Sequence, residues 1–289
     1  MKQKVLIAVT TYPLPSRSYD ELVCTAGVLE DGTWIRIYPI PFKFLQGLRQ
    51  DNKVSTYKYT WIELELNRRK DDFRPESHSP VRRDFSDVTI LDSISTKGTG
   101  WSIRHSFVAA NVYTDMSKLI EQSKKPTYKS LATFKPASFT GFEWKEEKER
   151  DWKPEWKDKL KQLDMFLPQS QDGSSVRKMI PKLPYKFYYR FADVNGKPSR
   201  LMIEDWEIGV LFFKCLRDYG SETLALEKVK QKYWDEFMSK NDIYLFLGTT
   251  KTFHAKNAPN PFVIIGVFYP PLNMSQPKLK PTPQLSLFA

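Results

Sequence analysis

Cysteine and histidine are scarce in this sequence. The 289 residues include 2 cysteines, Cys24 and Cys215, and 3 histidines. Two cysteines so far apart argue against the disulfide framework of a small secreted domain and favour a reducing, cytoplasmic location. Because no histidine stands beside a cysteine at the spacing of zinc ligands, we predict no structural metal site.

Long apolar runs are also missing. No segment has the length of a membrane span, and the apolar stretch at 5–9 is too short for the core of a signal peptide. This stretch is rich in β-branched residues and predicts a buried first strand instead. We therefore expect no membrane partner.

Familiar catalytic signatures are absent as well. None of the 12 glycines stands in the spacing of a phosphate-binding loop before a Lys-Ser or Lys-Thr pair. The sequence also lacks a nucleophile elbow, the motif set of a protein kinase and a metal-binding histidine pair. We therefore predict no cofactor from motifs.

Positive charge and aromatic side chains are abundant. The formal net charge is +11, and aromatic residues make up 14% of the chain. A surplus of lysine and arginine attracts phosphate backbones in a salt-sensitive way, and exposed aromatic rings stack on unpaired bases. This composition favours a nucleic-acid partner, with single-stranded DNA as the preferred form.

Short apolar runs joined by tight turns dominate the chain. An Asp-Gly turn at 31–32 and an Asn-Gly turn at 195–196 each separate two such runs, as in β-hairpins. The segments 204–219 and 222–238 have the start and stop residues of helices, with Gly220 between them. We predict an α+β fold, rich in antiparallel strands, with a helical hairpin near the C-terminus.

Composition divides the chain into four parts. We predict a β-rich N-terminal domain at 1–142, a charged linker or insertion at 143–178 and an α+β domain at 179–269, the two domains being able to pack as one unit. The last part, 270–289, is rich in proline, which prevents a regular helix and is typical of an extended tether.

The C-terminal residues resemble a short docking motif. Gln284, Leu285, Ser286, Leu287 and Phe288 follow the order of the peptide by which bacterial polymerases and repair proteins bind the replication sliding clamp. An extended peptide of this kind places the glutamine amide on a polar ledge and the last two apolar side chains in a pocket. The resemblance implies recruitment to the clamp; the alternative is a tail that folds back on its own core.

A second candidate motif lies in the charged segment. Gln162, Leu163, Asp164, Met165 and Phe166 have the same order. Apolar residues around them recur at helical spacing, so one face of an amphipathic helix is the alternative. If both motifs bind, the protein engages two pockets of one ring and gains avidity.

The N-terminal order of strands resembles that of prokaryotic proteins with dual OB-like domains. The likeness rests on a first strand, a second strand that contains Cys24, and the segment 32–36 (Gly-Thr-Trp-Ile-Arg) before an aliphatic-proline step. Residues 37–39 (Ile-Tyr-Pro) depart from the tighter Arg-Pro pattern of that group. The resemblance implies small barrels that bind single strands or tRNA-like loops. An ordinary hairpin with a buried Trp and Tyr is the alternative.

Period-2 alternation places three candidate nucleic-acid contacts on one strand face. Trp34, Arg36 and Tyr38 point the same way in a strand over residues 33–38, and Lys43 and Arg49 follow it. A cation between two aromatic rings suits a phosphate flanked by stacked bases. We expect this face to contact nucleic acid.

Four carboxylates and one histidine are the candidates for catalysis. Glu63 and Glu65 share a strand face and could bind Mg²⁺, whereas Glu204 and Asp205 stand at a helix start, where the helix dipole also favours acidic residues. His254, in a loop after a buried strand, is a candidate general base. A clamp-recruited nuclease or base-modifying enzyme that uses Mg²⁺ is therefore the alternative to a non-enzymatic binding protein acting in replication, repair or defence against foreign DNA.

Overall fold

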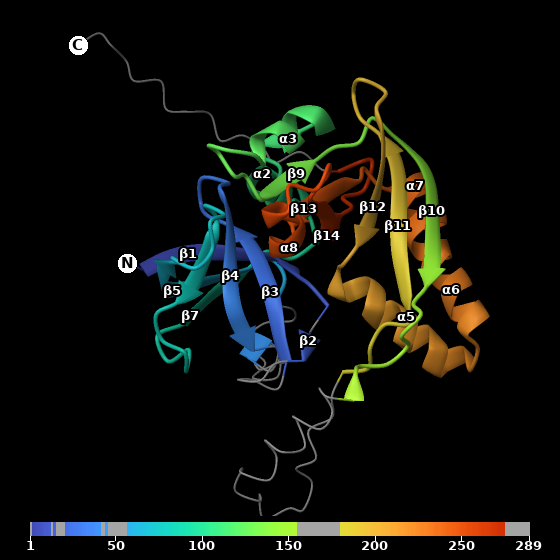
Figure 1. Cartoon of the computed structure of the whole chain (residues 1–289), viewed down its shortest axis with the longest axis horizontal. Coiled ribbons are helices and arrows are strands. Elements are labelled where there is room, and N and C mark those ends of the chain that lie inside the picture. Colours follow the sequence, from blue (N-terminus) through green and yellow to red (C-terminus); the bar gives the residue numbers. More distant parts are fainter. Residues whose placement is uncertain are drawn as a thin grey trace, which may run out of the picture.

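The protein contains two curved β-sheets that lie side by side, with its longest helices along the second sheet (Figure 1). This computed structural model describes residues 2–12, 14–15, 21–41, 44–45, 57–154 and 180–274. Within these ranges, no helix combines the length and the apolar character needed to cross a lipid bilayer.

The first sheet has seven strands, five of which close a barrel. The strands are β1 (Lys2–Thr10), β2 (Leu14–Pro15), β3 (Glu21–Val28), β4 (Trp34–Pro41), β5 (Thr60–Arg68), β6 (Ser77–Pro80) and β7 (Thr89–Ser93). Neighbours around the barrel follow the order β1-β3-β4-β6-β5-β1, and only β4 and β6 among them run parallel. This Greek-key order is that of an OB-like barrel.

Turn chemistry and alternation explain these strands. Gly32 has φ +80°, a left-handed conformation that glycine adopts without strain, and the Thr33 amide donates to Asp31 Oδ1 at 2.8 Å. The β3–β4 hairpin therefore forms where the Asp-Gly pair predicts it. Aliphatic side chains of alternate positions fill the barrel: Val5, Ile7, Val23, Ile35, Ile37, Ile62 and Leu64.

The second sheet also has seven strands, in the order β10-β11-β12-β14-β13-β9-β8. They are β8 (Val112–Tyr113), β9 (Leu131–Phe134), β10 (Ser138–Glu146), β11 (Tyr185–Ala192), β12 (Pro198–Ile203), β13 (Tyr244–Thr249) and β14 (Phe262–Phe268). β9 pairs with β13 and β10 pairs with β11, so these two segments form the halves of one strand that bends at residues 135–137. Apart from this bend, the strand order repeats that of the first barrel, and β12 and β14 run parallel as β4 and β6 do. We refer to this second sheet as the second barrel.

A helical hairpin covers one face of the second sheet. It consists of α5 (Trp206–Tyr219) followed by a continuous helix built from α6 (Glu222–Lys230), the π-helical turn η1 (Gln231–Glu236) and α7 (Phe237–Lys240). The Asp205 and Ser221 side chains cap the starts of α5 and α6, and Gly220 ends α5 at φ +66°. Apolar side chains of α5 and α6 pack on Phe187 and other core residues of the sheet.

The other face of the second sheet packs partly on the first barrel. A shared apolar cluster joins Leu6, Val28 and Trp34 of the first barrel to Phe246 and Ile265 of the second. The short helices α2 (Gly100–Val108), α3 (Met116–Gln122) and α8 (Lys251–Ala255) complete the described structure. Burial of this cluster favours the two barrels packing as one unit.

A buried ion pair and a close ring contact add to the junction. Lys58 Nζ of the first barrel lies 3.5 Å from Asp205 Oδ1 at the start of α5, and both side chains are buried. The Tyr12 ring lies so close to Gly209 on α5 that a Cβ there would stand 2.3 Å from the ring atom Cε2. Only glycine therefore allows this approach of the first barrel to the helix.

The structure confirms the predicted α+β class, with its antiparallel character and its late helical hairpin. The predicted division into 1–142, 143–178, 179–269 and 270–289 stays a prediction. β10 extends across residue 142 and pairs with β11, and its Phe139 and Phe142 pack against the core of the second sheet.

Candidate functional site

The predicted nucleic-acid face on β4 is largely covered. Trp34 is 7% exposed and Arg36 is 5% exposed. The Trp34 ring packs edge-on against Phe246 at 4.9 Å, and its Nε1 donates to Thr133 Oγ1 at 3.1 Å. The prediction that these two side chains form an exposed binding face is therefore wrong, because the second barrel covers that face.

Arg36 instead links the two barrels. Its Nη1 donates to Ser77 Oγ at 3.1 Å and to Ser130 Oγ at 2.9 Å, and its Nη2 donates to the Ser130 carbonyl at 3.2 Å. Ser130 Oγ in turn donates to Glu76 Oε2 at 2.7 Å. Burial, helped by the nearby cation Arg74, lowers the pKa of Arg36 to about 10. This network has a structural role in joining the barrels.

The remaining members of that predicted face fall in two groups. Tyr38 is half-buried within β4, with the Arg69 guanidinium 5.1 Å from its ring centre. Lys43 and Arg49 lie outside the described residues. Tyr38 is therefore the one predicted contact that the described structure leaves partly open to solvent.

The equivalent strands of the second barrel are open. In β11, Phe187, Tyr189 and Phe191 point into the core, so Lys186, Tyr188 and Arg190 point to the opposite side. Among the described residues, the apolar contacts of the first barrel with that side lie over β9, β13, β14 and Met202 of β12. We call the open part, with Glu143, Lys145, Lys186, Tyr188, Arg190 and Arg200, the β10–β12 face.

An arginine lies over the tyrosine ring at the centre of the β10–β12 face. The Arg200 guanidinium carbon is 3.6 Å from the centre of the Tyr188 ring, which is a close cation–π contact. Glu143, opposite Tyr188 in the strand register, accepts a hydrogen bond from Arg200 Nε and lies 2.6 Å from Arg190 Nη2. The Arg200 hydrogen bond is the main reason that the pKa of Glu143 is lowered.

The cations of this face remain accessible despite their partners. The side chains of Arg190 and Arg200 are 57% and 45% exposed. Lys186 forms an ion pair with Glu147, while Lys145 is exposed beside it in the register. The four cations Lys145, Lys186, Arg190 and Arg200 outnumber the two carboxylates that pair with them, Glu143 and Glu147. The face therefore carries a surplus of positive charge around an aromatic ring. Such a surface can bind phosphates and stack bases.

The acidic candidates do not converge on a metal site. Glu63 and Glu65 occupy half-buried positions of β5, and Glu63 Oε2 lies 3.8 Å from Lys2 Nζ. In the part of the chain that the structure describes, no three histidine, cysteine, aspartate or glutamate side chains come together as a metal site. Catalysis by Glu63 or Glu65 therefore stays an untested prediction without geometric support.

Glu204 and Asp205 lie at the barrel junction. Asp205 caps α5 by accepting from the Glu207 amide, and it forms the buried ion pair with Lys58. Burial raises the pKa of Asp205 to about 6 and also raises the pKa of Glu204. Among the described atoms, Asp205 Oδ2 accepts no hydrogen bond. The cap and the ion pair account for Asp205 structurally.

His254 is likewise held by the fold. It is 5% exposed, its Nδ1 lies 3.0 Å from Thr249 Oγ1, and its Nε2 contacts the Ser123 carbonyl. Burial lowers its pKa, which keeps the ring neutral. With both ring nitrogens engaged and the ring enclosed, His254 has no opening toward a substrate in this structure.

Both predicted clamp motifs lie outside the described residues. These are the C-terminal motif with Gln284, Leu285, Ser286, Leu287 and Phe288, and the second motif with Gln162, Leu163, Asp164, Met165 and Phe166. They remain predictions from the sequence.

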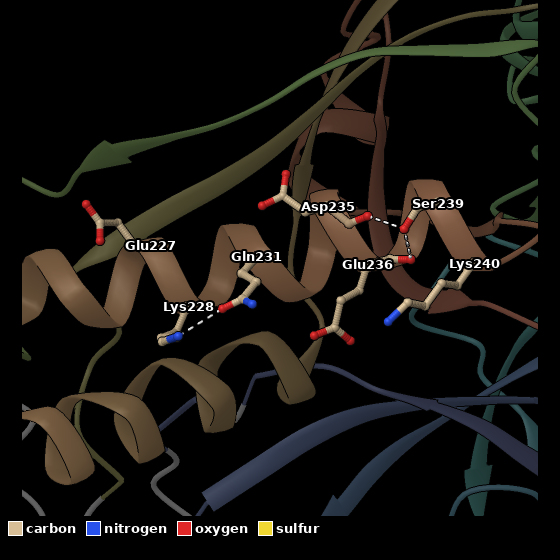
Figure 2. Close-up of a pocket in the computed structure, with 7 residues that line it drawn as sticks. All are labelled: Glu227, Lys228, Gln231, Asp235, Glu236, Ser239 and Lys240. Atoms are coloured by element: carbon tan, nitrogen blue, oxygen red, sulfur yellow. Dashed lines mark hydrogen bonds between the residues drawn. The ribbon is translucent and has the colours of Figure 1, made fainter.

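A shallow hollow of about 450 Å³ lies on the helix α6–η1–α7. Figure 2 shows its lining side chains, all of which come from this one helix: Glu227, Lys228, Gln231, Asp235, Glu236, Ser239 and Lys240. Lys228 Nζ donates to Gln231 Oε1 at 3.0 Å, and charges of both signs alternate along the hollow. Mixed charge on a single helix is typical of a solvated surface, so we place no site here.

The sequence contained an overlooked signal for the β10–β12 face. Lys186, Tyr188 and Arg190 alternate with three buried aromatic residues in β11, which is the same period-2 argument that was applied to β4. Alternation alone does not tell which of two such faces another part of the chain will cover. That choice depends on the packing between the barrels.

Comparisons with known proteins match the chain to two domain families. No curated protein matches it. A solved structure described as a murine DNA binding protein bound with ds DNA aligns over 96% of this chain and 99% of its own, with 10% identity and a TM-score of 0.30. Residues 1–110 match a domain of unknown function, DUF8758. Residues 112–289, more than half of the chain, match another domain of unknown function, DUF8757, and the protein therefore belongs to the DUF8757 family.

Proposed function

We propose that the protein binds single-stranded nucleic acid on the β10–β12 face and is recruited by its C-terminal peptide to the bacterial sliding clamp, in DNA replication, repair or defence against foreign DNA. The observation that supports binding most is the Arg200–Tyr188 stack between exposed cations. An unpaired base can stack on the exposed side of the guanidinium while its phosphates meet Lys186 and Arg190. A duplex hides its base faces, so this arrangement favours single strands.

The net charge supports the same proposal. The chain carries +11 at pH 7, and a formal excess of this size draws phosphate backbones to its surface. Charge alone does not select a site. The β10–β12 face adds the aromatic ring and the regular spacing of strand side chains.

Binding is tested by removing two cations from this face. We expect the Lys186→Gln/Arg190→Gln variant to bind a fluorescent oligothymidylate less tightly and to lower the slope of log K against log salt by about 1.4, since each lost phosphate contact removes about 0.7. Fluorescence anisotropy across a salt titration gives both values.

A matched control removes the same charge elsewhere. Arg217 and Lys230 are exposed on α5 and α6, on the other side of the second sheet. The Arg217→Gln/Lys230→Gln variant should bind as the unaltered protein does. Equal losses in both double variants would show that total charge matters and would refute the β10–β12 face as the site.

Clamp recruitment is proposed from the sequence of the tail. A short peptide that becomes ordered on binding is expected to have a dissociation constant in the micromolar range, about −8 kcal/mol. A chain that ends at Lys280 should therefore lose binding to purified bacterial clamp and keep its melting temperature. Phe288→Ala should cost about 2 kcal/mol of binding free energy, as a buried aromatic anchor does. Equal clamp binding by the shortened and intact chains would contradict the proposal.

A further inference from the structure

Two loops, one from each barrel, are joined beside the short helix α8. The loop after β5 reaches α8 through Lys251 Nζ, which donates to the Asp71 carbonyl at 2.7 Å. Arg74 Nη1 of the same loop donates to the Thr249 carbonyl, just before α8, at 2.7 Å. The segment after α3 joins them, because His254 of α8 contacts the Ser123 carbonyl. Three chain segments distant in sequence thus meet at one surface.

These segments bring five exposed lysines together. Lys251 begins α8 and Lys256 follows its end, Lys124 and Lys125 follow Ser123, and Lys70 precedes the Asp71 carbonyl that Lys251 contacts. Among the described residues, none of the five forms an ion pair with a carboxylate. Their positive charge is therefore available to a partner.

The acidic side chains of the loop after β5 are already engaged. Asp71 pairs with Arg69, and Asp72 pairs with Arg74 in the interior. Glu76 accepts from the Ser130 amide at 3.0 Å. These carboxylates have partners within the loop or at the barrel junction, and of the five lysines only Lys251 also helps to lower the pKa of one of them, Asp71, among the described residues.

An exposed aromatic ring lies on α8, between Lys251 and Lys256 in the sequence. Phe253, on α8, is 48% exposed, although large apolar side chains are usually buried. In contrast to Phe253, the rings of Phe73 and Tyr128 pack against the buried His254 of α8. Phe253 lies between Lys251 and Lys256 in the chain, so this segment combines an exposed stacking surface with cations that can contact phosphates.

We propose that this surface, the α8 patch (Phe253, Lys70, Lys124, Lys125, Lys251 and Lys256), is a second contact for the phosphate backbone of the nucleic acid held on the β10–β12 face. The inference rests on the proposed function and extends it. β11 and β13 are three strand positions apart in the sheet, or roughly 14 Å at about 4.8 Å per strand. A short oligonucleotide therefore fills only the β10–β12 face, and a longer one reaches both surfaces.

Oligonucleotides of two lengths test the inference. Lys124→Gln/Lys125→Gln/Lys256→Gln should weaken binding of an oligothymidylate of about 25 nucleotides by about tenfold and lower its salt slope by about 2. The same variant should bind an oligothymidylate of about 5 nucleotides as the unaltered protein does. Phe253→Ala should weaken the longer oligonucleotide about fivefold or more without changing the salt slope, because stacking releases no counterions.

The control variant Lys214→Gln/Arg217→Gln/Lys230→Gln loses the same charge from α5 and α6 and should bind both lengths normally. The inference is overturned if the patch variant binds the longer oligonucleotide as tightly as the control does. It is also overturned if the patch variant loses equal affinity for the longer and the shorter oligonucleotide. Loss of binding to anionic vesicles in place of oligonucleotides would assign the patch to a lipid surface and also overturn it. Failure of the unaltered protein to bind either length would contradict the proposed function itself.

Discussion

Replacing Arg36 with alanine should destabilise the fold without acting directly on nucleic-acid binding. Arg36 is 5% exposed and donates three hydrogen bonds across the barrel junction, to Ser77 and Ser130. Removing it leaves two buried hydroxyl groups and a carbonyl with fewer partners, beside the charge of Glu76. An unsatisfied buried polar group is costly, so the network should weaken as a whole.

The expected loss in the free energy of unfolding follows from those hydrogen bonds. Hydrogen bonds from a charged donor each contribute about 1.5–3 kcal/mol, so three of them amount to at least about 4.5 kcal/mol. The alanine variant no longer bears the cost of burying a charged guanidinium, and this offsets part of the loss, because the described acceptors of Arg36 are all neutral. We expect a net loss of about 3 kcal/mol in the free energy of unfolding.

Urea unfolding and oligonucleotide binding, measured on two alanine variants, check this prediction. Arg190→Ala is the matched control because Arg190 is exposed on the β10–β12 face. It should change stability by less than about 0.5 kcal/mol and weaken binding. The reasoning is refuted if Arg36→Ala leaves stability unchanged and weakens binding as much as Arg190→Ala does.

Three further predictions concern stability and charge. Burial raises the pKa of Asp205 above its ordinary value of 3.8. The stabilising contribution of Asp205 is therefore fully present below about pH 4 and is lost as the pH rises through its raised pKa. In urea unfolding, the difference in stability between the unaltered protein and Asp205→Asn should fall from pH 4 to pH 7.5, and a constant difference would contradict this. Gly209→Ala should lower the melting temperature, at a cost of about 1–3 kcal/mol, because the new methyl group meets the Tyr12 ring, whereas Gly141→Ala has room and should not. Glu143→Gln should strengthen oligothymidylate binding up to about fivefold, because it frees Arg190 and Arg200 from their ion pairs. Glu146→Gln removes the same charge away from that face, and an equal gain in this variant would refute the role of Glu143.

Local chemistry made much of the fold predictable. The Asp-Gly and Asn-Gly pairs form hairpins between β3 and β4 and between β11 and β12, and Gly220 separates two helices as expected. Each of these signals acts over a few residues. The split of one strand into β9 and β10 and the crossover that makes β12 and β14 parallel depend on contacts far apart in sequence, so the sequence pattern did not reveal them.

The site was harder to predict for the same reason. Alternation along β4 and along β11 is equally regular, and in both strands it groups cations with aromatic rings. Only the packing of the barrels buries Trp34 and Arg36 while leaving Tyr188 and Arg190 accessible. The α8 patch draws its lysines from three segments, so no single motif contains it.

The most direct test of single-strand binding on the β10–β12 face is ultraviolet cross-linking of the protein to oligothymidylate, with the cross-linked peptide sequenced by mass spectrometry. The account predicts a cross-link within β11 or β12, at Tyr188 or beside it, which is lost in the Lys186→Gln/Arg190→Gln variant at moderate salt. Cross-links confined to β3 and β4, or to the helices α5, α6 and α7, would contradict the account.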